Sequence, residues 1–382
     1  MELDAQVGVV GVGTMGSMAL WQLARRGIPA IGFEQFRVGH ELGAGVGEAR
    51  QFRANYLEDD VREIMTHAEN EYRELEEESG LSLLTLTGGL TIGAEDSPVI
   101  RELTSRMAAA GDDARFLGRS EMHDRYPQHV LREDDVVLWN DRSGFIRPEI
   151  SVAAASTTAR AMGAEIVEGC AITELEPHDD HVVIRSEGGS WRVRRAIVTA
   201  GPWIWRLLPR TLVPGGDLGR LLLTWFPTRD DAAFSPDRYP TFTRDIDGVV
   251  IYGLPSLWSS TARVGFAGPR SRFADPDILE RSIVPRHEID AIQRLVADLI
   301  PGLVPTVVRT GTHLDAYTPD GQPLIGPIDD GGRIFVAAGF SGRGFKMAPV
   351  IGRILAELGA DGTSEIDISR WRPSRFSLPA RN

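Results

Sequence analysis

The first 34 residues alternate between apolar runs and a glycine-rich turn. Residues 7–10 form an apolar run, and glycines follow it at positions 11, 13 and 16. Apolar residues then recur at helical spacing over residues 14–26, and a second apolar run over residues 30–33 ends at Glu34. This order predicts a strand, a helix and a second strand, with the helix N-terminus facing the glycine turn.

Helical spacing of apolar residues and short strand-like apolar runs alternate along the rest of the chain. Helices are predicted over residues 60–79, 97–110, 119–126, 149–162, 277–299 and 345–358. Strands are predicted over residues 84–92, 165–198, 220–267 and 334–338, and residues 141–148 are typical of a turn. We therefore predict an α/β fold with α+β elements, in which a nucleotide-binding unit is interrupted by insertions.

The glycine turn has the spacing G-x-G-x-x-G of a dinucleotide-binding fingerprint. Gly11 permits the tight turn, Gly13 lets a pyrophosphate approach the backbone, and Gly16 lets the helix pack closely on the strand. The free N–H groups of the helix N-terminus favour phosphate. Glu34 is placed to accept hydrogen bonds from a ribose, which favours FAD or NAD over NADP.

Composition narrows the class of protein. The chain has 382 residues and a formal net charge of −13, which argues against nucleic acid as a partner. Cys170 is the single cysteine, so an intramolecular disulfide and a cysteine-rich zinc site are excluded, and no metal is expected. No apolar stretch approaches the ~20 residues that span a bilayer. We expect a soluble, cytoplasmic protein without a membrane partner.

Five separated segments together carry a family resemblance. They are the glycine fingerprint with Glu34, residues 47–53 with Tyr56, residues 199–203, residues 318–323 and residues 338–346. In order and spacing the chain resembles the monomeric sarcosine oxidase and N-methyltryptophan oxidase group, within the D-amino-acid-oxidase family of FAD-dependent amine oxidoreductases. The resemblance implies oxidation of the C–N bond of a small amino acid, N-methyl amino acid or cyclic imino acid to an imine. The hydride passes to flavin N5, and O2 or another acceptor reoxidises the flavin.

The resemblance also implies two discontinuous domains. Residues 1–85, 148–215 and 305–382 would form a Rossmann-like FAD-binding domain. Residues 86–147 and 216–304 would form a substrate-binding domain on a mixed or antiparallel sheet.

Site residues follow from the same resemblance. Arg53 and Lys346 would hold the substrate carboxylate, since a guanidinium binds it bidentately and an ammonium adds a point charge. Tyr252 would line the substrate pocket, and Arg263 would stand beside the flavin. The residues expected to contact FAD are Gly11, Gly13, Thr14, Met15, Gly16, Glu34, Gln35, His40, Gly43, Ala44, Arg50, Ile172, Ala200, Gly201, Trp203, His313, Gly339, Ser341, Gly342, Arg343, Gly344, Phe345 and Lys346.

The chain departs from the family pattern at four positions. His313 stands where the sarcosine oxidases carry the cysteine that binds flavin covalently, so we expect non-covalent FAD, with a histidyl linkage left open. Arg263 replaces a lysine that promotes reaction with oxygen, which leaves the electron acceptor open. Val46 and Ala267 replace histidines, so sarcosine is not named as the substrate.

Two alternatives remain at this stage. The opening also resembles nicotinamide-dependent β-hydroxyacid dehydrogenases, although their second domain is all-helical and this chain has a strand-rich middle. A flavin-binding protein without turnover is the other alternative.

Overall fold

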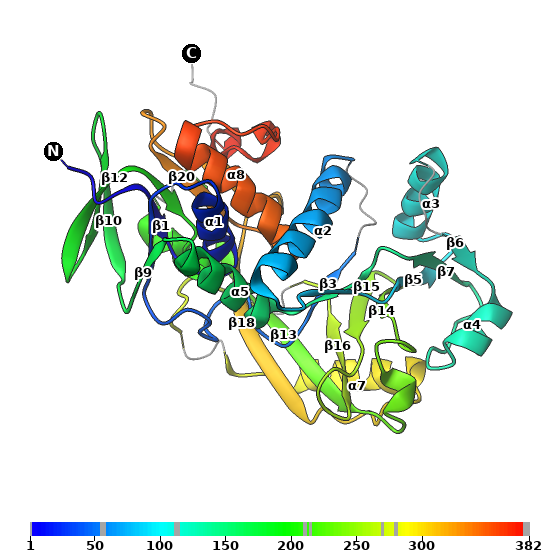
Figure 1. Cartoon of the computed structure of the whole chain (residues 1–382). Coiled ribbons are helices and arrows are strands. Elements are labelled where there is room, and N and C mark those ends of the chain that lie inside the picture. Colours follow the sequence, from blue (N-terminus) through cyan, green and yellow to red (C-terminus); the bar gives the residue numbers. More distant parts are fainter. Residues whose placement is uncertain are drawn as a thin grey trace, which may run out of the picture.

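The computed structural model describes residues 2–53, 59–110, 115–208, 212–213, 216–268, 271–278 and 282–376. Within these residues the chain forms two large sheets and a small one. Two long strands, β13 (Asp217–Pro227) and β18 (Arg309–Tyr317), run from beneath the first sheet into the second (Figure 1). Leu218 and Leu314 on these strands belong to the same apolar cluster as the first sheet.

The first sheet is built on five parallel strands in the order β9-β2-β1-β12-β20. β1, β2 and β20 are buried along nearly their whole length, as expected for central parallel strands, whereas β9 and the first half of β12 are partly exposed. The parallel strands are β1 (Ala5–Val10), β2 (Ala30–Glu34), β9 (Glu165–Glu168), β12 (Gly189–Val198) and β20 (Ile334–Ala338). The antiparallel strands at its edges are β10 (Ile172–Pro177), β11 (Val182–Ser186) and β19 (Leu324–Pro327).

Helices α1 (Thr14–Arg25), α5 (Pro148–Ala161) and α8 (Ala348–Asp361) cover one face of this sheet, and α2 (Asp59–Ser79) packs outside them (Figure 1). A Cβ atom on Gly352 would lie 2.6 Å from the Met18 backbone, so α8 crosses α1 at close range. The remaining short helices are α6 (Ile204–Leu207) and the 3-10 turns η1 (Gly201–Trp203), η3 (Ala232–Phe234), η5 (Phe345–Met347), η6 (Ser369–Trp371) and η7 (Pro373–Phe376).

The second sheet has the order β17-β13-β16-β15-β14-β5-β7-β6, with β18 on β13. It is mixed, because β5 and β14 are parallel and the other pairs are antiparallel. Its further strands are β5 (Gly89–Ala94), β6 (Arg115–Leu117), β7 (Asp135–Asn140), β14 (Thr241–Ile246), β15 (Val249–Leu254), β16 (Thr261–Phe266) and β17 (Ser271–Phe273). Helices α3 (Pro98–Ala110), α4 (Arg119–Arg125) and α7 (Arg286–Leu299) surround it.

Two sequence predictions of local structure are wrong. Residues 141–148 contain a strand, β8 (Gly144–Ile146), which pairs with β3 (Arg50–Phe52) and β4 (Leu84–Leu86) in the small sheet. Both partners are distant in sequence, so the local pattern does not reveal them. The helix expected from residue 277 begins only at Arg286, because Pro285 takes an extended conformation (ψ 137°) as its N-cap.

The expected domain ranges cross the sheets at two places, namely β8, which pairs with β3 in the small sheet, and β18. β18 falls in the range 305–382 assigned to FAD binding, yet it pairs along its whole length with β13 of the second sheet. The rest of the division stays a prediction, and we propose that the two domains meet along β13 and β18.

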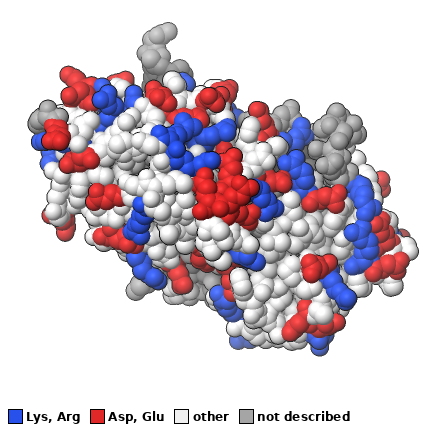
Figure 2. All heavy atoms as spheres, in the orientation of Figure 1, with Lys and Arg blue, Asp and Glu red and all other residues white. Residues whose placement is uncertain are grey.

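Acidic and basic side chains are interspersed on the face of the molecule shown in Figure 2. Arg25, for example, pairs with Glu74 at 2.7 Å and with Glu78 at 2.8 Å, joining α1 to α2. No helix among the described residues is long and apolar enough to cross a membrane.

Glu71 of α2 is a buried carboxyl that faces α1 and α8. Gln22 donates to its Oε2 at 3.3 Å, and Nη1 of Arg353 lies 3.3 Å from its Oε1. Burial raises the pKa of Glu71 from 4.5 to about 7, although Arg353 opposes the shift. Because the folded state then holds this proton more tightly than the unfolded state, this carboxyl lowers the free energy of unfolding as pH rises from about 4.5 to about 7.

We expect Glu71→Gln to remove this loss of stability at rising pH. At pH 8 the variant should be more stable than the wild type by roughly 1–3 kcal/mol, and the gain should shrink at pH 5. Urea unfolding at both pH values measures it, with Glu74→Gln on the exposed side of α2 as control. An equal loss of stability at both pH values would contradict the assignment.

Candidate active site

A cavity of about 890 Å³ opens at the carboxyl ends of the parallel strands. Its wall includes Gly11 after β1, Glu34 at the end of β2, Thr199 after β12 and Gly339 after β20. Ligands of open α/β sheets bind at this edge of the sheet. The volume lies in the range of small-molecule and cofactor sites.

The glycine turn holds α1 against two strands of the sheet. Gly11 has a φ of +90°, and a Cβ atom on Gly16 would lie 1.9 Å from the Gly11 carbonyl oxygen. Thr199 Oγ1 donates to the same carbonyl at 2.7 Å, which joins β12 to the turn. Around Gly13, by contrast, a Cβ atom would meet nothing within 4 Å. The turn is therefore tight on the protein side and open on the cavity side.

Glu34 completes this end of the cavity. Its Oε2 accepts from the Val12 N–H at 3.0 Å and its Oε1 from the Phe36 N–H at 3.1 Å. Each carboxylate oxygen has a further lone pair, so the side chain can also accept from a ribose. His40 accepts from the Leu42 N–H through Nδ1, which leaves the proton on Nε2, 3.5 Å from Glu34 Oε1.

These observations fit an adenine dinucleotide. The open Gly13, the N-terminus of α1 at Thr14 and the Glu34 carboxylate, which has lone pairs left for a ribose, line the same cavity. Further predicted contacts lie on the same cavity wall: Thr14, Met15, Gln35, Gly43, Ala44, Ile172, Ala200, Gly201 and Trp203.

A second glycine turn, residues 339–344, closes the other end. Ser341 and Gly342 have positive φ angles of 53° and 80°. The Ser341 N–H donates to the Ala316 carbonyl at 3.1 Å and the Gly342 N–H to Asp315 Oδ2 at 2.7 Å. β18 therefore takes up the N–H groups of two residues that we expected to contact FAD. Gly339, Ser341, Gly342, Arg343, Gly344 and Phe345 all line the cavity.

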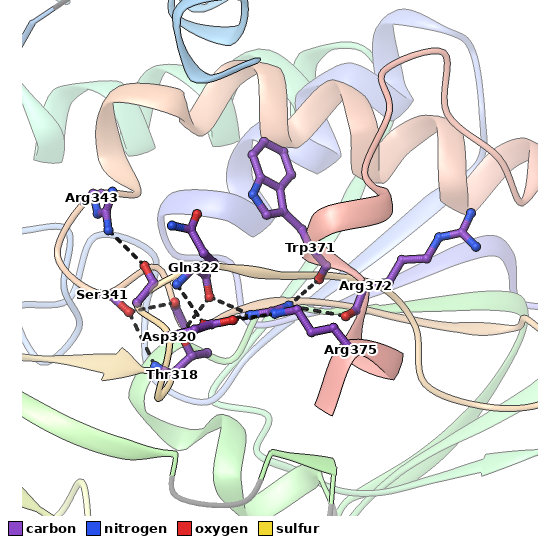
Figure 3. Close-up of polar contacts among 10 residues, drawn as sticks. Thr318, Asp320, Gln322, Ser341, Arg343, Trp371, Arg372 and Arg375 are labelled. Atoms are coloured by element: carbon purple, nitrogen blue, oxygen red, sulfur yellow. Dashed lines mark hydrogen bonds and ion pairs between the residues drawn. The ribbon is translucent and has the colours of Figure 1, made fainter. Parts of the chain in front are cut away.

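The motif at residues 318–322 supports this turn from outside (Figure 3). The Thr318 N–H donates to Ser341 Oγ at 3.4 Å, and Thr318 Oγ1 donates to the Gln322 carbonyl at 2.7 Å. Arg375, from the C-terminal 3-10 turn η7, donates to Asp320 at 2.8 Å. This arginine and the Gln322 N–H hold the pKa of Asp320 at about 2, although burial opposes the shift.

Of the four residues predicted to act on the substrate, three line this cavity and Arg263 does not. Arg53, which follows β3, Tyr252 of β15 and Lys346 of η5 all line it. Lys346 Nζ donates to the Arg343 carbonyl at 3.3 Å. Lys346 is also the single lysine among the 41 basic residues of the chain.

Arg263 is the exception, because it lies behind the cavity wall. It is 3% exposed and donates to the Gly47 carbonyl at 2.6 Å. Its Nε and Nη2 find no hydrogen-bond partner among the residues that the structure describes. Burial lowers the pKa of Arg263. Gly16 also stands behind the wall, where its role is packing.

Arg50 and His313 form a buried pair on the cavity wall. Arg50 Nη2 lies 3.1 Å from His313 Nε2 and donates to the Ala44 carbonyl at 3.0 Å. Burial, with the charge of Arg263, lowers the pKa of Arg50 to about 10, so the guanidinium is charged at neutral pH. Because arginine only donates, Nε2 of His313 must accept, and the proton is on Nδ1. Burial and the two arginines lower the pKa of His313 well below its usual value.

Of the positions where the chain departs from the family, Ala267 lines the cavity, and Val46 is not part of its wall. Tyr56 lies outside the described residues. Sequence reasoning missed several cavity residues, namely Gln51, Glu149, Cys170, Thr243 and Asp315. Asp315 could have been found, since it lies two residues after His313 and therefore on the same face of a strand.

Comparison with known proteins decides the family. The family model for FAD dependent oxidoreductases, DAO, matches residues 6–358. The chain belongs to this family. A monomeric sarcosine oxidase of Streptomyces avermitilis is 31% identical over 377 residues, which cover 97% of each chain. An N-methyl-L-tryptophan oxidase of Yersinia pestis is 23% identical over 98% of this chain and 100% of that protein.

A solved structure of NikD, an amino acid oxidase essential for nikkomycin biosynthesis, has the same fold. Its TM-score is 0.86 at 24% identity, and the match covers 97% of each chain. The family match confirms the α/β fold, the FAD cofactor and the oxidoreductase class predicted from the sequence. It does not favour the nicotinamide-dependent alternative.

Replacement of two glycines of one turn should have different effects. Gly16→Ala forces a methyl group against the Gly11 carbonyl and should destabilise the apoprotein by about 3 kcal/mol. Gly13→Ala should leave apoprotein stability within about 0.5 kcal/mol but weaken FAD binding roughly tenfold or more, because its methyl group enters the cavity. Thermal unfolding of apoprotein and titration with FAD measure the two effects. Equal effects in the two variants would contradict this division of roles.

We expect the flavin to be released when the holoenzyme is denatured. A neutral imidazole has one nitrogen lone pair available for bond formation, and in His313 that lone pair accepts from Arg50. After acid precipitation, flavin absorbance should appear in the supernatant. A pellet that retains flavin would show a covalent bond, and a His313→Ala variant would then identify or exclude His313 as its site.

Proposed function

We propose that this FAD-dependent oxidoreductase oxidises the C–N bond of a small amine that carries a carboxylate. The substrate class is an amino acid, an N-methyl amino acid or a cyclic imino acid. The product is an imine, which water hydrolyses or which cyclises.

The observation that carries the proposal is that two cations, Arg53 and Lys346, line the same cavity. In a cavity shielded from water, a guanidinium and an ammonium bind a carboxylate far more strongly than at the surface. The use of lysine at position 346 supports the proposal. The chain uses arginine at 40 of its 41 basic positions and lysine at this position alone, where a compact point charge fits beside a guanidinium.

The chain's own residues position and select the substrate. Arg53 and Lys346 hold the carboxylate, which fixes the carbon that bears the nitrogen. The buried positive charges of Arg50 and Arg263 disfavour an additional unpaired cation, so the neutral amine is the favoured reacting form. Tyr252 covers one side of the pocket and excludes water. Bound FAD supplies the hydride acceptor, and the protein supplies position and charge.

Oxygen is the acceptor that we propose. The two relatives named above are oxidases, and charged side chains line the cavity. Arg263 does not oppose this acceptor, since its charge lies next to the cavity although its guanidinium is bound to Gly47. We also propose that the enzyme works in a reducing cytoplasm, which its single cysteine supports.

The test is anaerobic mixing of the holoenzyme with sarcosine, glycine and L-proline, and with dimethylamine, methylamine and pyrrolidine, which are the same amines without the carboxylate. At least one carboxylate-bearing amine should bleach the flavin faster than its decarboxylated analogue. Arg53→Ala or Lys346→Ala should weaken binding of that substrate and of propionate by ~2–5 kcal/mol. Admitting air should then restore the oxidised spectrum.

Arg309→Ala is the matched control, since this exposed arginine pairs with Glu48 outside the cavity wall. Unchanged propionate affinity in both Arg53→Ala and Lys346→Ala would contradict the assignment of these two residues as the carboxylate clamp. Failure of every amine to reduce the flavin would contradict the proposed reaction. If the reduced enzyme stays reduced in air, the electron acceptor is a compound other than oxygen.

A further inference from the structure

Asp315 is a carboxylate on the cavity wall that has no role in the function proposed above. It lies on β18, two residues after His313, and both side chains line the cavity. The alternate positions Leu314 and Ala316 are buried in the apolar core beneath the first sheet. β18 therefore turns its apolar face to the core and its polar face to the ligand.

The hydrogen bonds of Asp315 leave part of its capacity unused. Oδ2 accepts from the Gly342 N–H at 2.7 Å, and Oδ1 accepts from its neighbour's N–H, that of Ala316, at 2.9 Å. An ionised carboxylate has about four lone-pair sites, so two remain with respect to the residues that the structure describes. The side chain is only half-buried, and it lies on the cavity wall. These two sites are available to a ligand.

The surroundings of Asp315 are rich in positive charge. Arg50 on β3 interacts with it electrostatically, and Arg343 of the second glycine turn and Lys346 of η5 line the same cavity. On its own strand His313 is neutral, and Tyr317 and Tyr252 of β15 are the nearby phenols. Asp217 and Arg272 interact electrostatically with Tyr317 and not directly with Asp315. Of these groups on the cavity wall, Asp315 carries the negative charge. Glu149, another carboxylate on the wall, accepts from the Gly47 N–H at 2.5 Å and interacts electrostatically with Arg50 and Arg263.

We propose that Asp315 binds the ammonium group of the substrate and accepts its proton. This inference rests on the proposed function, and it extends the recognised ligand from a carboxylate to a zwitterion. In the step, one N–H bond of the ammonium breaks and one O–H bond forms on a carboxylate oxygen of Asp315. The products are a neutral amine and a neutral carboxylic acid. No oxidant or further reactant takes part.

The proton step resolves a difficulty in the reaction. Amino acids are ammonium ions in neutral water, whereas C–H cleavage needs the nitrogen lone pair. A carboxylate in the same cavity as Arg53 and Lys346 lets the abundant zwitterion enter and lets the amine become neutral there. Burial raises the pKa of Asp315 from 3.8 to about 6, with Arg50 and the Gly342 N–H opposing the shift. The carboxyl is therefore ionised at neutral pH and more basic than an ordinary aspartate.

A purely structural role would be to anchor the glycine turn through Gly342. Asp315→Asn separates the two roles, because the amide oxygen still accepts from the Gly342 N–H while the charge and the proton acceptor are lost. Asp217→Asn is the matched control, since Asp217 pairs with Arg272 on the neighbouring strands and does not line the cavity.

The experiment titrates holoenzyme with three probes in the absence of oxygen and follows the visible flavin spectrum. Glycine carries both charges, propionate replaces the ammonium by a methyl group, and ethylammonium carries no carboxylate. We expect the wild type to bind glycine more tightly than propionate, and Asp315→Asn to lose about tenfold or more of that preference. Ethylammonium should bind the variant about tenfold or more weakly, and its binding to the wild type should weaken as pH falls through about 6.

Each outcome decides one point. Unchanged glycine preference and unchanged ethylammonium affinity in Asp315→Asn would overturn the inference and leave Asp315 as an anchor. Propionate that fails to bind the wild type would overturn the Arg53 and Lys346 clamp, while the ethylammonium comparison would still decide the role of Asp315. A pH dependence of ethylammonium binding that persists unchanged in the variant would overturn the proton-accepting role.

Discussion

The contact between the backbones of α1, β1 and β12 is the constraint on which the site depends. It exists because Gly16 has no side chain and because Thr199 donates to the carbonyl of Gly11. This contact places the N-terminus of α1 at the carboxyl edge of the sheet, next to the ends of β2 and β20. The other lining residues are arranged around that edge. They include His313 and Asp315 on β18, which pairs with β13 of the second sheet.

Charge inside the cavity is the second organising feature. Arg50 and Arg263 are buried in or behind its wall, and each costs desolvation free energy, which their lowered pKa values reflect. Carbonyl oxygens of Ala44 and Gly47 offset part of that cost. A negative group that enters the cavity therefore meets preorganised positive charge without reorganisation of solvent, which is the condition for electrostatic stabilisation of a developing charge.

Local sequence patterns predicted the parts of the fold that are local in space. The β1-α1-β2 unit, α2 and α5 follow from apolar periodicity and glycine placement within a few tens of residues. β8 was missed because its partners β3 and β4 are distant in sequence. The pairing of β18 with β13 likewise joins distant segments and leaves no local signal. At the site, the motif residues Arg50, Arg53 and Lys346 were predicted from resemblance. The position of Arg263 behind Gly47, by contrast, depends on the packing of β16 and on no motif.

Lys346 has a consequence for chemical work on this enzyme. Apart from the terminal amine, it provides the protein's sole primary amino group. Reagents that acylate or alkylate amines therefore have one side-chain target, and it lies in the cavity. A spectroscopic probe or a tether attached in this way would report from the ligand site without any engineered residue.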